Sequence, residues 1–201
     1  MNSVTNARNH EMLHFFHRQG TKMTNSNAVS IINEITAIEL KMFQAVNNEG
    51  GKADCQNQPE TFCAMRQVVY EVLSPHFLIA WLKDLRMAEG AGRNIMTEKY
   101  ALMCGNIEMP AISQTIKDIV SCELSWLQAA AKEHPDYFDG NDADFCRYLL
   151  CELLMYSEPT LHAYAQCIAD AQAAGRNMVM ERLENIKKLL CSTTPHAPSL
   201  H

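Results

Sequence analysis

The stretch AEGAGRNIMTEKY (Ala88–Tyr100) returns in nearly the same form as AQAAGRNMVMERL (Ala171–Leu183). The step from Gly92 to Gly175 is 83 residues. Because so many further matches keep this register, we predict a tandem duplication whose halves pack about a pseudo-twofold axis. A step of 83 relates Ser74 to Ser157, Leu78 to Leu161, Trp81 to Tyr164 and Phe62–Cys63 to Phe145–Cys146, and a step of 84 relates Glu39–Leu40 to Glu123–Leu124.

Apolar residues at three- and four-residue spacing predict four helices in each half. Glycine pairs, Ser-Pro and Gly-Arg-Asn separate them, because proline and glycine interrupt helices. The expected fold is therefore all-α with about eight helices. Their expected ranges are 27–46, 59–73, 76–89 and 95–104, then 112–133, 143–156, 160–174 and 178–190.

The chain of 201 residues divides into three parts by composition. Residues 1–25 are polar and are expected to form a flexible extension. Residues 26–191 are expected to form one all-α domain, with repeat one at about 28–105 and repeat two at about 112–190. Residues 192–201 have the composition of a disordered tail.

Bulk composition excludes several classes of partner. The formal net charge is −6 and no run of Lys and Arg occurs, which argues against nucleic acid and against an anionic membrane surface. No window approaches the roughly 18 apolar residues of a membrane helix, and no signal peptide is recognisable. We therefore expect a cytoplasmic protein whose eight cysteines are reduced.

The repeated Gly-Arg-Asn corner admits two interpretations. Glycine allows a left-handed exit from one helix and asparagine caps the next. In the structural interpretation, Arg93 and Arg176 form ion pairs with Glu39 and Glu123. In the functional one, each arginine beside a helix N-terminus binds a carboxylate or phosphate.

The loop NNEGGKADCQ (Asn47–Gln56) has no counterpart in the second half. Asn47, Asn48 and Gln56 are candidate ligand contacts. Cys55 is a candidate nucleophile, although thiol chemistry needs a base and an activating environment.

Two metal hypotheses can be weighed. A carboxylate-bridged di-metal site could use Glu39 and Glu123, but such a site also requires two E-x-x-H motifs. The sequence contains one E-x-x-H motif, and it lies in the N-terminal extension. Within HEMLHFFH, three histidines at steps of four and three suit adventitious metal binding. We assign no metal site and no cofactor. These histidines are His10, His14 and His17.

The phrases AIELKMFQAVNNEGGKADCQ, TFCAMR, GRNIMTEKYALM and LLMYSEPTLHAY resemble a bacterial family known as a domain of unknown function, number four-one-two-five in its series. The resemblance covers about Ile35 to Ile186. It implies an all-α fold and no established reaction, substrate or cofactor.

From these features we expect a binding or regulatory protein that holds a small anionic ligand or a protein partner between the two repeats. Its contacts would be Arg93, Arg176, Asn47, Asn48 and Gln56. The alternative is an enzyme at the same crevice, with Glu39 and Glu123 as acid, base or metal ligands and Cys55 or Tyr156 assisting.

Overall fold

The computed structural model describes residues 25–47, 51, 54–138 and 140–193. Over these residues the chain forms eight α-helices and two short 3-10 helices, and no strand. The predicted all-α class is therefore confirmed. None of the described helices is both long and apolar enough to cross a lipid bilayer.

The first half contains α2 (Asn25–Gln44), η1 (Asp54–Asn57), α3 (Pro59–Tyr70), α4 (Pro75–Gly90) and α5 (Ile95–Met103). Pro59 and Pro75 occupy first turns, where no amide hydrogen is needed. Ser74 caps α4 by accepting a hydrogen bond from the Phe77 amide at 3.2 Å. Helix α2 begins at Asn25, two residues before the expected start at residue 27.

The second half contains α6 (Gln114–Glu133), η2 (Pro135–Tyr137), α7 (Asp142–Leu153), α8 (Glu158–Ala173) and α9 (Met178–Thr193). Here α6 packs against α7, α8 and α9, just as α2 packs against α3, α4 and α5. In each half, the first helix therefore contacts all three of the helices that follow it in sequence.

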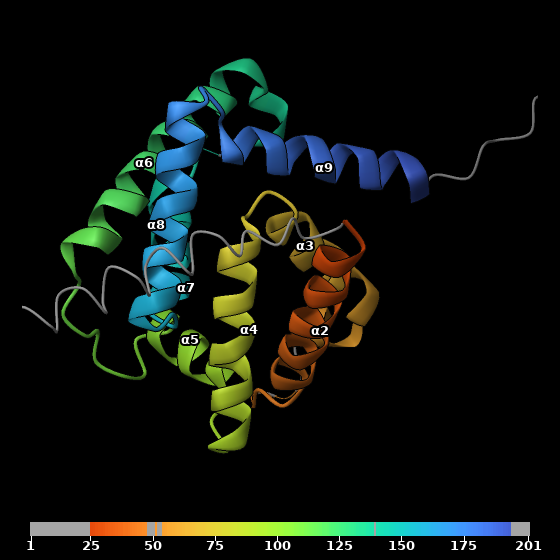
Figure 1. The fold of residues 1–201 in the computed structure, drawn as a ribbon, viewed down its shortest axis with the longest axis vertical. Helices are drawn as coiled ribbons and strands as arrows, with labels where there is room; N and C mark the ends of the chain where they lie inside the picture. The colour runs from red at the N-terminus through yellow and green to blue at the C-terminus, as the bar shows by residue number, and fades with distance from the viewer. Residues whose placement is uncertain (1–24, 48–50, 52–53, 139, 194–201) are drawn as a thin grey trace, which may run out of the picture.

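Contacts between the halves are reciprocal. Helices α4 and α8 lie side by side and run in opposite directions (Figure 1), while α5 packs against α7 and α3 packs against α9. If the halves are equivalent, α5 corresponds to α9 and α7 corresponds to α3. The α5–α7 contact then corresponds to the α9–α3 contact, which is the pattern that pseudo-twofold packing requires. Their shared core contains Phe77, Leu78, Trp81, Tyr164 and Ile168, all under 7% exposed.

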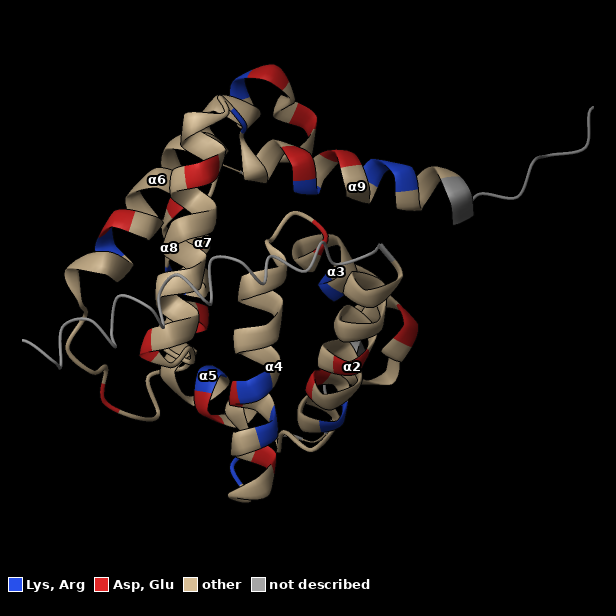
Figure 2. Ribbon diagram, viewed as in Figure 1, with Lys and Arg blue, Asp and Glu red and all other residues tan. Residues whose placement is uncertain are grey.

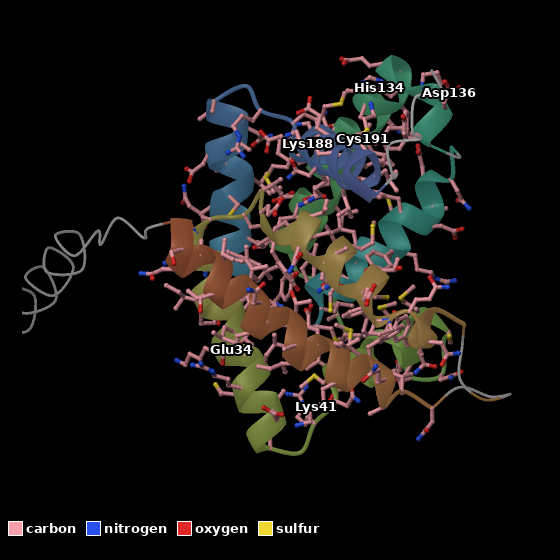
Figure 3. All side chains as sticks on the ribbon, turned by 90° about the vertical axis from the view of Figure 1, so that its right-hand side faces the viewer. Glu34, Lys41, His134, Asp136, Lys188 and Cys191 are labelled. Carbon is pink, nitrogen blue, oxygen red and sulfur yellow. The ribbon has the colours of Figure 1, made fainter. Side chains whose placement is uncertain are left out.

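Charged residues of both signs are interspersed along the described helices in the view of Figure 2. Glu34 and Lys41 both project from α2 (Figure 3), where Glu34 binds Arg86 of α4 and Lys41 binds Glu89 of α4. Because these side chains are 42–74% exposed, each pair contributes about 0–1 kcal/mol to stability.

Candidate functional site

The two Gly-Arg-Asn corners have the same local structure. Gly92 (φ +68°) and Gly175 (φ +65°) adopt the left-handed conformation that ends α4 and α8. Asn94 then caps α5, accepting from Thr97 N at 3.0 Å, and Asn177 accepts from Met180 N at 3.0 Å. The predicted glycine exits and asparagine caps are therefore confirmed.

The same two asparagines, not the arginines, attach the corners to the first helix of each half. Asn94 Nδ2 donates to the Met42 carbonyl of α2 at 2.8 Å, and Asn177 Nδ2 donates to the Trp126 carbonyl of α6 at 3.0 Å. Each asparagine therefore serves as both cap and tether.

Arg93 and Arg176 form bidentate pairs with Glu98 and Glu181, five residues further along the chain. Their predicted ion pairs with Glu39 and Glu123 are wrong, because those carboxylates are buried and bound elsewhere. The α4–α5 and α8–α9 turns lie at opposite ends of the molecule (Figure 1), so the two arginines do not line one shared crevice.

Glu39, fully buried in α2, is the centre of a polar cluster in the first half. Arg66 of α3 donates to both of its oxygens, from Nε at 2.7 Å and from Nη2 at 2.6 Å. Tyr70 OH also donates to it, and Trp81 Nε1 donates at 3.0 Å. With both oxygens occupied, Glu39 anchors α3 and α4 to α2.

The cluster continues into the second half through Glu152 of α7. Arg66 Nη2 donates to Glu152 Oε1 at 2.7 Å, and Lys99 of α5 donates to Oε2. Burial alone would raise the pKa of Glu152, but Arg66 and Lys99 outweigh it and lower that pKa to about 2. The four charges balance, with two carboxylates and two cations, which is how buried ions are tolerated.

Glu123 of α6 occupies the place in the second half that Glu39 occupies in the first. Arg182 of α9 donates to its two oxygens at 2.6 and 3.1 Å, and Tyr164 OH donates as well. Burial raises the pKa of Tyr164 well above its usual range, so this phenol stays protonated. Glu123 is therefore saturated by donors too.

The loop candidates have different surroundings. Gln56 is 4% exposed and donates to the carbonyls of Phe43 at 2.9 Å and Val46 at 3.0 Å. These two bonds close the C-terminal end of α2, and the expected role of Gln56 as a ligand contact stays a prediction. Asn47 is exposed. Asn48, the Cys55 side chain and the three histidines lie outside the described residues.

Tyr156 contacts Trp81 and Phe77 edge to face, with ring centroids 4.7 and 5.3 Å apart. Burial, reinforced by Glu152, raises the pKa of its hydroxyl well above the usual range. Burial likewise raises the thiol pKa of Cys63, Cys122, Cys146 and Cys151. In the described part of the chain, no three His, Cys, Asp or Glu side chains are placed to hold a metal ion.

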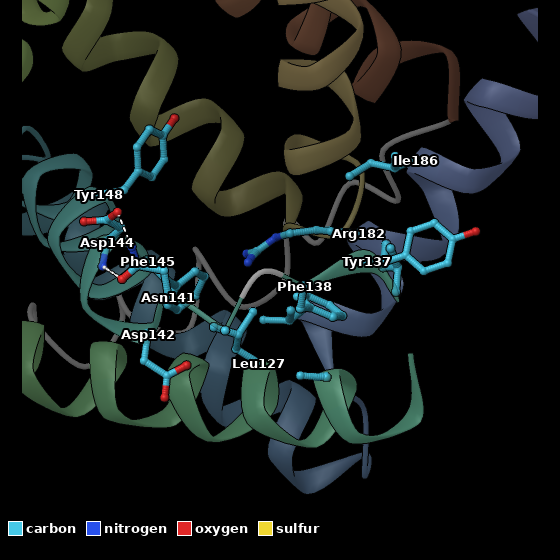
Figure 4. A pocket seen from close by; sticks show the side chains of 14 residues that line it. Leu127, Tyr137, Phe138, Asn141, Asp142, Asp144, Phe145, Tyr148, Arg182 and Ile186 are labelled. Atoms are coloured by element: carbon cyan, nitrogen blue, oxygen red, sulfur yellow. Dashed lines mark hydrogen bonds between the residues drawn. The ribbon is translucent and has the colours of Figure 1, made fainter. Parts of the chain in front are cut away.

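A cavity of about 540 Å³ opens beside Arg182, between α6, α7, α9 and the η2 segment (Figure 4). Its apolar wall consists of Leu127, Ala131, Phe138, Phe145, Leu183 and Ile186. Its polar groups include Asp142, Asp144, Tyr148 and Arg182. Arg182 points into this space, and its Nε is buried without a hydrogen-bond partner among the described residues.

Aromatic rings pack together at the equivalent place in the first half. The steps of 84 and 83 relate Leu127, Phe145 and Leu183 to Phe43, Phe62 and Tyr100. Phe43 stacks on Phe62 with centroids 4.7 Å apart, and Tyr100 lies 6.0 Å from Phe43. Phe43 and Tyr100 in the first half thus stand where the second half has the smaller Leu127 and Leu183 of the cavity wall.

Sequence reasoning missed Arg66, Lys99, Glu152 and Arg182. Two signals could have revealed three of these residues. Glu152 is the one charged residue in the apolar run LLCELL. The step of 83 residues makes Lys99 the counterpart of Arg182 in the repeat. A charged residue that interrupts an apolar helix face indicates a buried ion pair.

Comparison with known proteins gives one match. No curated protein and no solved structure matches the chain. A family model matches residues 29–192, which include all of α3 to α8 and nearly all of α2 and α9. The chain therefore belongs to the family described as protein of unknown function (DUF4125).

Proposed function

We propose that this protein is a cytoplasmic binding protein that holds a small, largely apolar molecule in the cavity between α6, α7 and α9. The observation that carries the proposal is the difference between the halves. Stacked aromatic rings occupy one place, whereas its equivalent has an opening of about 540 Å³. That volume lies within the range of about 300–1,000 Å³ typical of small-molecule sites.

The polar groups support binding rather than catalysis. A general acid or base works best with a pKa near the operating pH. The pKa values of Glu152, Tyr156 and Tyr164 are all displaced away from neutrality. Glu39 and Glu123 accept hydrogen bonds on both oxygens, so an enzyme built on these carboxylates has less support than a binding site.

The proposed site lies within the second half, not between the halves. Every residue that lines the cavity belongs to the segment between Leu127 and Ile186. Arg93 and Arg176 take no part in it. The first half contributes indirectly, because Lys99 lies 3.8 Å from the ring centroid of Tyr148 in the cavity wall.

The substitution Leu127→Phe tests this proposal, since it introduces the aromatic residue found at the equivalent place, Phe43. We expect at least one of naphthalene, 2-naphthamide and 2-naphthoate to bind the unmodified protein in calorimetry. Leu127→Phe should weaken that binding at least tenfold. Ile79→Phe, on the exposed side of α4, is the matched control and should leave it unchanged. Absence of binding by these three probes and by their cationic analogue 2-naphthylmethylammonium, or an equal effect of the two variants, overturns the proposal.

A further inference from the structure

The cavity walls and charges also indicate a class of ligand. Resting on the binding function proposed above, we infer that the ligand is an uncharged, planar aromatic molecule with a hydrogen-bond acceptor. Four aromatic rings line the cavity, from Tyr137, Phe138, Phe145 and Tyr148. Flat aromatic ligands gain most from such walls, because rings stack offset or edge to face.

The electrostatics of the cavity disfavour an anion. Arg182 is the cation among the lining residues, and both of its Nη atoms already bind the Glu123 carboxylate or Tyr164. Asp142 and Asp144 also line the cavity. An anionic ligand would therefore find a neutralised cation and two carboxylates nearby, which opposes the anionic ligand expected from the sequence.

A cationic ligand is disfavoured by the lysines that already use the ring faces. Lys99 Nζ lies 3.8 Å from the Tyr148 ring centroid, and Lys187 Nζ lies 4.4 Å from that of Tyr137. A cation that lies over an aromatic ring is attracted to the negative face of the ring's quadrupole, so each lysine occupies the face that a cationic ligand would need. A second cation at the same rings would meet like charge, whereas an uncharged aromatic ring would not.

Arg182 supplies the reason for an acceptor. Its side chain is 14% exposed, and its Nε is the buried donor without a partner in the described part of the chain. A buried donor left unpaired costs about 1–3 kcal/mol. Because less than 1 Å² of Nε is accessible, a carbonyl oxygen would reach it after the Arg182 side chain shifts towards the cavity, and would then recover that cost without adding charge.

Four probes of one shape separate these possibilities. They are 2-naphthamide, naphthalene, 2-naphthoate and 2-naphthylmethylammonium, titrated calorimetrically into the full chain. We expect 2-naphthamide to bind at least tenfold more tightly than either charged probe and several-fold more tightly than naphthalene. A charged probe that binds most tightly overturns this inference but leaves the binding function intact. Failure of all four overturns the function itself.

Two substitutions give a second measurement. Arg182→Lys keeps a cation for Glu123 and introduces the residue type found at the equivalent position, Lys99, but it removes Nε. It should abolish the preference for 2-naphthamide over naphthalene. Lys187→Gln should strengthen binding of 2-naphthylmethylammonium several-fold, whereas Lys188→Gln, whose lysine donates to Asn185, should not. If Arg182→Lys does not fold, the comparison of Lys187→Gln with Lys188→Gln still tests the inference. Equal effects of these two variants on binding of 2-naphthylmethylammonium would contradict the inferred role of the ring faces.

Discussion

The Lys99 ammonium in α5 donates to the Glu152 carboxylate in α7, so a buried ion pair joins the two halves of the molecule. Arg182, at the equivalent position 83 residues later, instead binds Glu123 within its own half. The two basic residues therefore make different connections from matching places. Because Lys99 binds to α7, its Nζ also lies 3.8 Å from the ring centroid of Tyr148, which lines the cavity of the second half.

Removing the Lys99 charge should destabilise the protein strongly. Lys99→Met leaves the buried Glu152 with Arg66 alone, so we expect the free energy of unfolding to fall by about 3–5 kcal/mol. Urea denaturation measures this change. Lys41→Met is the control, since its pair with Glu89 is exposed and should cost no more than about 1 kcal/mol. Similar losses for the two variants would contradict a buried, structural role for Lys99.

Acid should weaken the fold through Glu152. Its pKa is about 2 in the folded chain and 4.5 is its ordinary value, so the group is depressed on folding. Its stabilisation is fully present above about pH 4.5 and is lost as the pH falls towards 2, amounting to about 3 kcal/mol. Urea titrations at several pH values check this. The variant Lys99→Met/Glu152→Gln should show a shallower slope over that window, and an unchanged slope assigns the effect to other carboxylates.

The two corner asparagines should have matching energetic roles. Asn94→Ala and Asn177→Ala each remove a helix cap and a tether to a carbonyl, so each should cost about 1–2 kcal/mol. Arg93→Ala and Arg176→Ala break exposed pairs and should cost less than about 1 kcal/mol. Thermal unfolding compares all four. Unequal asparagine effects, or larger arginine effects, would argue against equivalent corners.

The glycines at the ends of α4 and α8 should resist substitution because of their backbone angles. Gly92→Ala and Gly175→Ala force a side chain into the left-handed region at a cost of about 1–2 kcal/mol, although no atom lies within 4 Å of the added Cβ. Gly90 is the last residue of α4 and has no positive φ, so Gly90→Ala should be neutral or stabilising by up to about 1 kcal/mol. Melting temperatures separate the two cases, and equal effects would exclude backbone strain as the cause.

The sequence alone determined the helices and placed their ends within three residues of the observed ones, because both depend on local chemistry. Apolar spacing, Pro59, Ser74 and Asn94 act within one or two turns, and each predicted helix is present. The repeat in sequence also led to the equivalent glycines and asparagines. The two-half interpretation stays a prediction that the asparagine pair can test.

Only the tertiary structure decided which charges meet and where a cavity remains. Arg66 reaches Glu39 across 27 residues and Glu152 across 86, and no local pattern specifies either contact. The sequence suggested Arg93 and Arg176 as partners of the buried glutamates. Each arginine instead pairs with the glutamate five residues further along the chain, Glu98 or Glu181. A cavity forms where side chains from α6, α7 and α9 fail to fill the space between them. That depends on summed side-chain volumes across distant segments, and so on packing rather than on any one stretch of sequence.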